Sequence, residues 1–440
     1  MTTPYHCELA WSGGERAARD VLIEVDGDRI SDVTPGSGAA PAGAVRLPGL
    51  TLPGFANAHS HAFHRALRGR TQSGAGSFWT WRRQMYKLAD RLDPDTYLRL
   101  ATATYAEMVL AGISVVGEFH YLHHDRGGTP YASPNAMADA LVVAARAAGI
   151  RLTVLDTCYL RGGIDVELAP TQRRFADADA HSWAARASAL AEAPDVRVGA
   201  AVHSVRAVDP ASIAVVAAWA TERGAPLHAH VSEQPAENEQ TLAAHGCTPT
   251  QLLAERGALG GRFTAVHATH VTADDIARLG AARCWCCFCP TTERDLADGI
   301  GPAGLLRDAG ARLTLGSDSH AVIDLLEEAR AVELDERLAT GVRGNHDTAS
   351  LLRAATADGH ASLGWPDAGH LAPGALADLT TIRLDSVRTT GTADERALDI
   401  AVFAASAADV DHVVVGGRVV VRDGRHVAID VPGELRAVLA

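Results

Sequence analysis

The chain has 440 residues, of which 47% are hydrophobic and 21% are charged, and its formal net charge is −13. These proportions are ordinary for a globular protein, and the length suits a large α/β barrel with a smaller module. The negative charge argues against a nucleic-acid partner, which would require a basic face. An anionic ligand would have to be bound by local arginines rather than by the overall field.

The N-terminal segment and the cysteines favour a reducing, cytoplasmic location. Residues 1–7 lack the basic and apolar regions of a secretory signal. The seven cysteines are odd in number and unevenly spread, so we expect no disulfide framework. No apolar run approaches the roughly 20 residues that span a bilayer, so we expect no membrane partner.

The first predicted elements are short strands between Asp20 and Val45. Apolar stretches in this region are interrupted by Asp26-Gly27-Asp28 and by Pro35-Gly36-Ser37-Gly38. Such interruptions are typical of tight turns between strands.

Two histidines, His59 and His61, then follow the apolar run from Leu50 to Ala56. In an extended strand, side chains two residues apart point to the same face. The two imidazoles can therefore bind one metal ion at the end of this strand.

Across residues 51–371, apolar runs typical of buried parallel strands alternate with stretches rich in alanine, leucine and arginine that predict helices. Eight such alternations predict a closed (β/α)8 barrel, in which the chemistry lies at the carboxyl ends of the strands. The predicted strands end near His59–His61, Phe119–Tyr121, Thr157–Tyr159, His203, His230–Glu233, His267, Cys289–Thr291 and Ser317–His320. The predicted helices include Tyr97–Leu110, Ala136–Ala148, Ala211–Arg223 and Ala273–Leu279. The segments Gly69–Lys87 and Arg161–Ala180 are long and irregular, and we expect loops over the site there.

Later strand ends add further candidate metal ligands. His230 ends the run that starts at Pro226, and Asp318 ends the run that starts at Leu313. Three histidines and one aspartate suit a divalent transition metal with a water molecule in the open position. Glu233, three residues after His230, is placed to act in the same pocket as an acid or base. Each of these residues alone fits a capping, ion-pair or loop role equally well, but chance would not put all of them at strand ends.

Other polar residues at strand ends are ambiguous. His203 and His267 also end apolar runs, and for each a structural hydrogen-bonding role competes evenly with a functional one. His270 is left without a role. The segment Pro290–Glu293 is expected to be a polar loop that contacts the substrate.

Four clustered cysteines do not predict a second metal centre. Neighbouring residues of a strand face opposite sides, so the four thiolates could not converge on one ion. We expect packed side chains that act as small hydrophobic groups. The four are Cys284, Cys286, Cys287 and Cys289.

The C-terminal part of the chain again predicts strands. They fall in Ala377–Ile382 and His412–Val421, and the second stretch contains a predicted hairpin at Gly416-Gly417. We therefore expect residues 1–50 and 372–440 to form one small β-sandwich domain outside the barrel.

With these residues identified, nearly the whole chain resembles the amidohydrolase superfamily, through Pro53–His61 at the start of the barrel and Pro373–Leu379 at its end. Within the superfamily it is similar to the formimidoylglutamate deiminases of histidine degradation. The segments that carry this narrower resemblance are Trp79–Arg82, Glu118–Tyr121, His203–Arg206, Cys289–Glu293 and Gly316–Ser319.

The resemblance implies a homodimeric enzyme that hydrolyses N-formimino-L-glutamate, a small dianionic amino-acid derivative, to N-formyl-L-glutamate and ammonia. It implies one zinc ion per chain, with Fe²⁺ or Mn²⁺ as alternatives, bound by His59, His61, His230 and Asp318. Asp318 would accept the proton of the attacking water, Glu233 would protonate the leaving nitrogen, and His267 would stabilise the attacking oxygen. The residues implied to bind the substrate carboxylates are Arg82, Tyr121, His203, Arg206 and His64. At the position of His64, related enzymes often carry glutamine. Arginine suits a carboxylate because its guanidinium donates two parallel hydrogen bonds.

Two other functions stay open. A deaminase of a nucleobase or related heterocycle would share the metal site and Glu233, but its pocket would favour stacking aromatic side chains over Arg82 and Arg206. A metal-free barrel that serves as a binding protein would have lost metal ligands, and this chain has all four.

Overall fold

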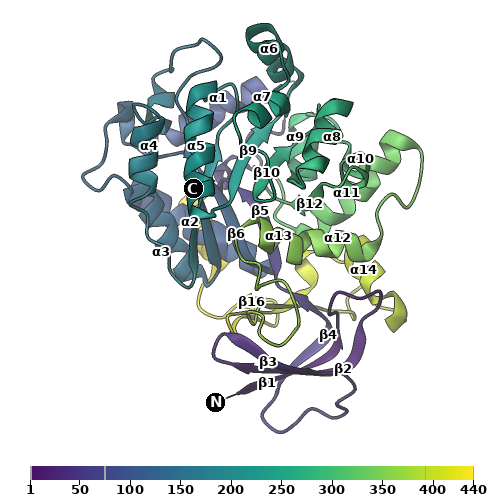
Figure 1. Ribbon diagram of the computed structural model, residues 1–440. Coiled ribbons are helices and arrows are strands. Elements are labelled where there is room, and N and C mark those ends of the chain that lie inside the picture. The colour runs from purple at the N-terminus through teal and green to yellow at the C-terminus, as the bar shows by residue number, and fades with distance from the viewer. Residues whose placement is uncertain (1, 74–75, 392, 440) are drawn as a thin grey trace.

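The computed structural model describes residues 2–73, 76–391 and 393–439, which form two eight-stranded sheets surrounded by helices. One sheet is a parallel barrel, and the other joins the two ends of the chain beneath it (Figure 1). The prediction of a (β/α)8 barrel with a β-rich part built from both termini is confirmed.

The barrel strands lie in sequence order, and each pairs in parallel with the next. All eight predicted strands are present, and each ends close to the predicted residue. The strands are β5 (Phe55–Ser60), β6 (Ile113–His120), β7 (Arg151–Cys158), β8 (Val196–Val202), β9 (Leu227–Val231), β10 (Phe263–His267), β11 (Trp285–Phe288) and β12 (Arg312–Leu315).

The barrel closes between its first and last strands through predicted metal ligands. The backbone N–H of Asp318 donates to the carbonyl of His59 at 3.0 Å, and the N–H of His61 donates to the carbonyl of Asp318 at 3.2 Å. Gly316 permits this approach, because a Cβ atom at that position would lie 2.7 Å from the Cβ of His59. Closure of the barrel therefore fixes His59, His61 and Asp318 relative to one another.

Helices cover the barrel, and their ends follow from local sequence. In α5, for example, Asp209 caps the first turn, Pro210 occupies the first helical position, and Gly224 ends the helix in the left-handed conformation. All four predicted helices are confirmed, and none of the helices in the described ranges is long and apolar enough to cross a membrane. The helices are α1 (Phe78–Ala89), α2 (Pro94–Leu110), α3 (Ala136–Ala148), α4 (Ala180–Ala187), α5 (Pro210–Arg223), α6 (Pro235–His245), α7 (Pro249–Glu255), α8 (Ala273–Ala281), α9 (Pro290–Leu296), α10 (Ala303–Asp308), α11 (Leu325–Thr340), α12 (Thr348–Ala355), α13 (Ala357–Ser362), α14 (Ala397–Phe403) and α15 (Val431–Leu439).

The second sheet has the order β16-β15-β14-β13-β4-β1-β2-β3, so strands from the two ends of the chain meet where β13 pairs with β4. Only β1 and β4 pair in parallel among the described strands of this sheet. The hairpin predicted at Gly416-Gly417 connects β14 to β15. Its strands are β1 (Thr3–Ala10), β2 (Ala18–Asp26), β3 (Arg29–Thr34), β4 (Val45–Pro53), β13 (Leu379–Ile382), β14 (Val410–Val415), β15 (Arg418–Arg422) and β16 (Arg425–His426). The domain boundaries at residues 50 and 371 stay a prediction.

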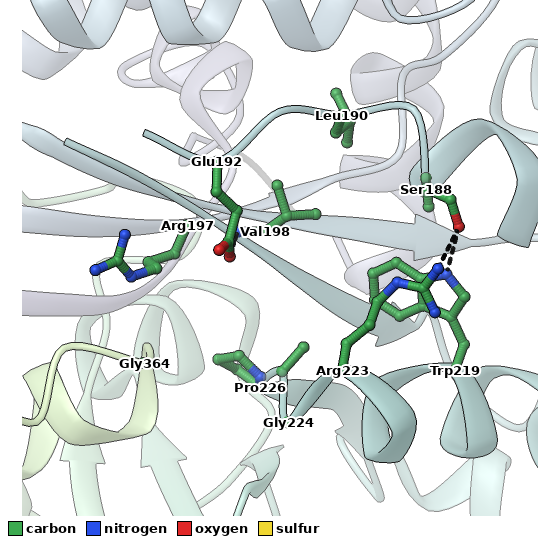
Figure 2. A pocket seen from close by; sticks show the side chains of 12 residues that line it. Ser188, Leu190, Glu192, Arg197, Val198, Trp219, Arg223, Gly224, Pro226 and Gly364 are labelled. Carbon is green, nitrogen blue, oxygen red and sulfur yellow. Dashed lines mark hydrogen bonds between the residues drawn. The ribbon is translucent and has the colours of Figure 1, made fainter. Parts of the chain in front are cut away.

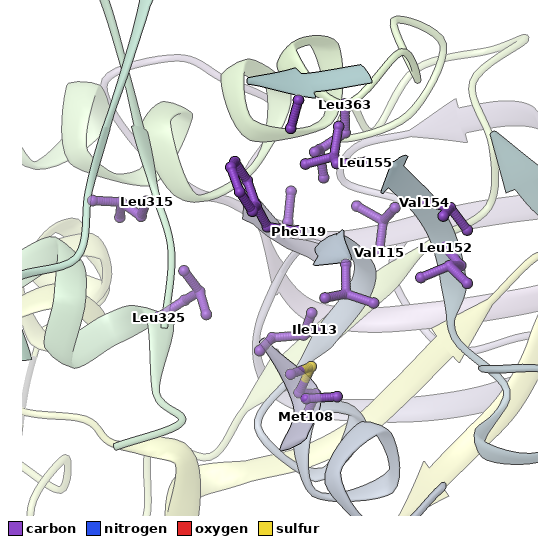
Figure 3. Close-up of a cluster of buried hydrophobic side chains, with 14 of the residues drawn as sticks. Met108, Ile113, Val115, Phe119, Leu152, Val154, Leu155, Leu315, Leu325 and Leu363 are labelled. Atoms are coloured by element: carbon purple, nitrogen blue, oxygen red, sulfur yellow. The ribbon is translucent and has the colours of Figure 1, made fainter. Parts of the chain in front are cut away.

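Apolar side chains fill the space around the barrel strands. Figure 3 shows Val115 of β6 and Val154 of β7 in one cluster with Met108 of α2 and Leu363, all of them buried. The four clustered cysteines are also buried and unpaired on and beside β11, as predicted. Their environment is apolar, so they act as small hydrophobic side chains.

Two predicted loops are helical in part. Gly69–Lys87 was expected to be irregular, but α1 begins at Phe78, where Ser77 and Thr80 form a capping box; residues 74 and 75 lie outside the described residues. Pro290–Glu293 forms the first turn of α9 rather than a loop, since proline favours the first helical position. The prediction was wrong at these two places because it gave too little weight to signals for a helix start.

Candidate active site

The structure places all the predicted site residues at the carboxyl end of the barrel. Most lie in or directly after a barrel strand, and two lie on the helical segments that follow β5. They are His59 (β5), His61 (after β5), Tyr121 (after β6), His203 and Arg206 (after β8), His230 (β9), Glu233 (after β9), His267 (β10), Asp318 (after β12), His64 (in the 3-10 helix Ala62–Leu67) and Arg82 (α1).

Four of these side chains converge into what we call the ligand cluster, composed of His59, His61, His230 and Asp318. One ligand atom from each lies within 4.8 Å of the others, and each residue is at most 7% exposed. Asp318 Oδ1 is 3.2 Å from His59 Nε2 and 3.3 Å from His61 Nε2. His59 Nε2 is also 3.2 Å from His230 Nε2.

The hydrogen bonds of the ring nitrogens fit a metal ion. His61 Nδ1 lies 2.9 Å from the carbonyl of Phe119, and His230 Nδ1 lies 2.8 Å from the carbonyl of His203. Because a carbonyl only accepts, each Nδ1 carries the proton and each Nε2 presents a lone pair to the cluster. Burial also lowers the pKa of His61 to about 3, so its ring is neutral. Three imidazoles and one carboxylate are a donor set for a divalent transition metal.

A second group of residues suits proton transfer. His267 Nε2 is 3.8 Å from Glu233 Oε1, and His267 Nδ1 is 3.3 Å from Glu293 Oε1. Burial raises the pKa of Glu233 above its ordinary value, although His267 and Arg206 oppose the shift. Burial alone would lower the pKa of His267, but the charges of Glu233 and Glu293 raise it well above its usual value. A carboxyl group with a raised pKa in contact with an imidazole can act as both a donor and an acceptor of protons.

The backbone is strained where these residues leave their strands. Ser232, His267 and Asp318 have φ angles of 52°, 70° and 40°, in the left-handed region that favours glycine. Such a residue costs on the order of 1 kcal/mol and persists where the surrounding structure holds it. Strain concentrated at three strand ends of one site is typical of a functional region.

A cavity of about 500 Å³ opens between α1, α6 and the loop after β7, and two arginines line it. Arg206 Nε donates to Glu237 Oε2 at 3.0 Å, and its Nη2 lies 3.7 Å from Glu233 Oε2. Arg82 donates to the hydroxyl of Tyr159 at 3.2 Å. The lining residues are Trp79, Arg82, Gly162, Gly163, Ile164, Val166, Arg206, Gln240, Ala243 and Ala244.

His203 connects the arginines to the ligand cluster. Its ring centroid is 5.1 Å from that of His230 and 4.5 Å from that of Tyr159. Burial lowers the pKa of His203 well below its usual value, and the charges of Arg206 and Arg82 lower it further. Side-chain contacts therefore run from Arg82 through Tyr159 and His203 to His230 of the ligand cluster.

The other two predicted substrate residues form a separate pair. The hydroxyl of Tyr121 lies 2.8 Å from His64 Nε2, and both side chains are buried. The ring of Tyr121 is 5.2 Å from that of His61 and 5.5 Å from that of His203. Tyr121 therefore borders the site directly, whereas His64 contacts its edge, with its ring 4.6 Å from that of His61.

Sequence reasoning missed three residues that hold the site together. Glu237 accepts the hydrogen bond of Arg206, and the available signal was its position in the first turn of a helix that starts at Pro235, shortly after the strand-end residue Glu233. Glu293 lies in the segment expected to contact substrate, but its bond to His267 was not predicted. Gln172, which donates to Tyr159 at 2.6 Å, comes from the irregular segment Arg161–Ala180 and carries no sequence signal.

A further group of histidines has metal-ligand spacing but a different chemistry. His120, His123 and Asp156 are buried within ligand distance of one another. Both oxygens of Asp156, however, accept hydrogen bonds from Arg186, at 2.8 and 2.9 Å. The guanidinium already neutralises this carboxylate, so the group forms a buried ion-pair network rather than a metal site.

A second cavity, of about 440 Å³, lies at the opposite end of the barrel. It is formed at the start of β8 and before β9, where Trp219 and Arg223 both donate to Ser188 (Figure 2). None of the predicted site residues lines it, so we assign it no part in the chemistry.

Comparison with known proteins agrees with this geometry. Residues 50–420 match the sequence model described as the amidohydrolase family. The chain is 38% identical to a formimidoylglutamate deiminase of Pseudomonas aeruginosa over 423 residues, which cover 93% of this chain and 92% of that protein. An 8-oxoguanine deaminase of the same species is 31% identical, covering 87% of this chain and 84% of its own length.

A solved structure shows the same architecture over the full length of the chain. The crystal structure of an amidohydrolase from Brucella melitensis superimposes with a TM-score of 0.91 and 32% sequence identity. The match covers 99% of each chain, so both the barrel and the terminal sheet are shared.

Proposed function

The chain belongs to the amidohydrolase family, and from this premise we propose that it hydrolyses N-formimino-L-glutamate to N-formyl-L-glutamate and ammonia. Its family and its relatives identify it as a hydrolase of C–N bonds. The observation that carries the choice of substrate is the cavity lined by Arg82 and Arg206, the second of which lies 3.7 Å from Glu233. Two cationic groups beside a metal centre suit a small dicarboxylate whose reactive group faces the metal.

The ligand cluster would hold one divalent metal, for which we propose zinc, with Fe²⁺ or Mn²⁺ as substitutes. When bound, such an ion lowers the pKa of a water molecule and makes it a nucleophile near neutral pH. Asp318, whose Oδ1 lies 3.2 Å from His59 Nε2, would accept a proton from the attacking water. His267 would stabilise the attacking oxygen through its Nε2.

Glu233 completes the reaction by transferring protons to the leaving group. Hydrolysis adds the oxygen of water to the formimino carbon, breaks the bond to the terminal nitrogen, and delivers both protons of the water to that nitrogen, which leaves as ammonia. The raised pKa of Glu233 suits it to carry these protons. Its position between His267 and Arg206 supports this role, because the reactive end of the substrate would lie near His267 and the anionic end near Arg206.

The carboxylates of the substrate would bind to side chains around the cavity. Arg206 and Arg82 would supply the positive charge. Tyr121 and His203, which lie closer to the ligand cluster, would donate hydrogen bonds to the substrate. His64 would act through Tyr121, with which it is hydrogen-bonded.

The test is release of ammonia by the purified protein from N-formimino-L-glutamate, measured beside 8-oxoguanine, guanine, cytosine and adenosine. We expect turnover of N-formimino-L-glutamate alone. Release from a heterocycle, with none from N-formimino-L-glutamate, would overturn the proposal.

A heterocycle deaminase is the second candidate, favoured by Trp79, which is 41% exposed on the cavity and could stack on a ring. In the structure this indole instead packs against Arg82, whose Cζ is 5.5 Å from the ring centroid. The third candidate, a metal-free binding protein, predicts less than about one-tenth of a metal ion per chain and no activity after metal addition. A cytoplasmic homodimer remains our prediction, and light scattering with the purified protein tests the dimer.

A further inference from the structure

Glu293 is a buried carboxylate that links the start of one helix to the imidazole of His267. It lies in the first turn of α9 and is 4% exposed. Its Oε1 accepts the backbone N–H of Cys289 at 2.9 Å and lies 3.3 Å from His267 Nδ1. One oxygen atom thus connects the end of β11 to the end of β10.

These contacts place a proton on Nδ1 of His267. The backbone amide of Cys289 donates to Glu293 Oε1, and as a carboxylate oxygen Oε1 can only accept from its second neighbour as well. His267 Nδ1 must therefore be protonated to bond with it. Nε2 is then the atom that faces Glu233, 3.8 Å away, and the reacting groups.

The other ring contacts of His267 do not fix this orientation. The ring of His230 stacks on it at 5.6 Å with an interplanar angle of 16°, and the edge contact with His59 is 6.0 Å between centroids. A half-turn of the imidazole leaves its plane unchanged, so stacking tolerates either orientation. That turn would replace Nδ1 by a carbon atom and break the bond to Glu293.

We infer that Glu293 is a positioning residue for the reaction, holding His267 with Nε2 directed toward Glu233 and the substrate. The inference rests on the role of His267 in the proposed function. In the proposed reaction Glu293 would neither contact the substrate nor bind the metal. It would instead determine the hydrogen bonding of His267, which acts on the attacking oxygen.

The neighbouring Glu328 offers a matched control. It is also fully buried and accepts the backbone N–H of Thr291, at 3.0 Å, in the same first turn of α9. Within the described part of the chain, it forms no hydrogen bond or ion pair with His267. Replacing it disturbs the start of α9 while leaving the imidazole untouched.

The experiment compares Glu293→Leu, Glu293→Gln and Glu328→Gln in the full-length, metal-loaded protein. Loss of a partner that orients a catalytic histidine typically costs about 10–100-fold in activity. We expect Glu293→Leu to lower kcat by about that factor with KM within about twofold. Glu293→Gln, whose amide oxygen still accepts from both donors, should retain most of kcat. Glu328→Gln should match the wild type, and all variants should bind the same amount of metal.

A double-mutant cycle separates positioning from a structural role. If Glu293 acts through His267, Glu293→Leu has no further effect on kcat in a His267→Ala background. Additive losses, a loss of metal, or equal losses in Glu293→Leu and Glu328→Gln would each overturn the inference. Because Glu293→Gln preserves size and hydrogen bonding, it keeps the test valid if the leucine variant fails to fold.

The test also distinguishes failure of the inference from failure of the proposed function. If the wild type acts on another substrate, the same cycle is run with that substrate. Nitrogen-15 spectra of the imidazole provide a readout independent of turnover. We expect a protonated His267 Nδ1 in the wild type and in Glu293→Gln, and loss of that state in Glu293→Leu. An unchanged Nδ1 signal in Glu293→Leu would refute the inference.

Discussion

Replacing Arg206 by methionine tests whether this side chain binds a substrate carboxylate. Arg206 Nε is already bonded to Glu237, so only the Nη groups remain to bind a ligand. The residue is 7% exposed and lines the cavity next to Glu233. The change therefore removes one of the two positive charges that line the cavity and leaves the volume of the side chain nearly the same.

The expected loss follows from the hydrogen bonds that the Nη groups can form. A hydrogen bond to a charged group contributes about 1.5–3 kcal/mol, so a two-point contact is worth about 3 kcal/mol or more. Since about 1.4 kcal/mol corresponds to a factor of ten, kcat/KM should fall by roughly 100-fold or more. The loss should be mainly in KM, because the carboxylate is bound equally in the ground state and the transition state. Arg206→Lys retains a point charge and should lose about tenfold.

The assay is ammonia release over a range of N-formimino-L-glutamate concentrations, together with two analogues that each lack one carboxylate. Arg223→Met at the opposite end of the barrel removes the same charge outside the site and should leave kcat/KM unchanged. One analogue should become indifferent to Arg206→Met, which identifies the carboxylate that Arg206 contacts. The reasoning is refuted if Arg206→Met leaves KM unchanged, or if both analogues lose as much as the full substrate.

Three other perturbations give distinct outcomes. Glu233→Gln should lower kcat by about 10²–10⁴-fold with metal still bound, and near-normal turnover would contradict its role in proton transfer. Removing metal with a chelator should abolish ammonia release and lower Tm, and Zn²⁺, Fe²⁺ or Mn²⁺ should restore both; activity that persists without metal would contradict the assignment. Burial raises the pKa of Asp358 from 3.8 to about 6, so its folded form holds a proton that the unfolded form releases, and stability falls as pH rises from about 4 to 6. Asp358→Asn should therefore raise Tm at pH 8 but not at pH 4, and an equal effect at both pH values would exclude this cause.

Much of the fold and the ligand cluster could be predicted because the signals are local. The period of two along β5 puts His59 and His61 on one face, and the alternation of apolar runs with helices predicts the barrel. In that fold all strand ends meet at one rim. His230 and Asp318, which are 88 residues apart in sequence, could therefore be assigned to the same site before any contact was known.

The residues that orient the site could not be predicted, because their partners are distant in sequence and depend on how helices pack on the rim. Arg82 and Tyr159 are 77 residues apart and meet only because α1 lies over the end of β7. Glu293 and His267 become neighbours through the pairing of β10 with β11 and the helical first turn of α9. A loop at Pro290–Glu293, as the sequence was interpreted, would not fix that carboxylate in place.

The site has opposite electrostatic character at its two ends, and this difference argues for the proposed substrate over a neutral heterocycle. Around His267 lie the carboxylates of Glu233, Glu293 and Asp318, whereas the cavity beyond Glu233 presents two arginines. A neutral ring would bring no charge to these guanidinium groups, so the Nη groups of Arg206 that are not bonded to Glu237 would gain no charged partner from it. A dicarboxylate with a basic formimino group presents the complementary charge at each end. Arg206 Nη2 lies 3.7 Å from Glu233 Oε2, at the boundary between the two ends, and its charge opposes the rise in the pKa of Glu233. In the proposed reaction it would also bind the anionic end of the substrate. We therefore propose that charge complementarity along this axis selects the substrate.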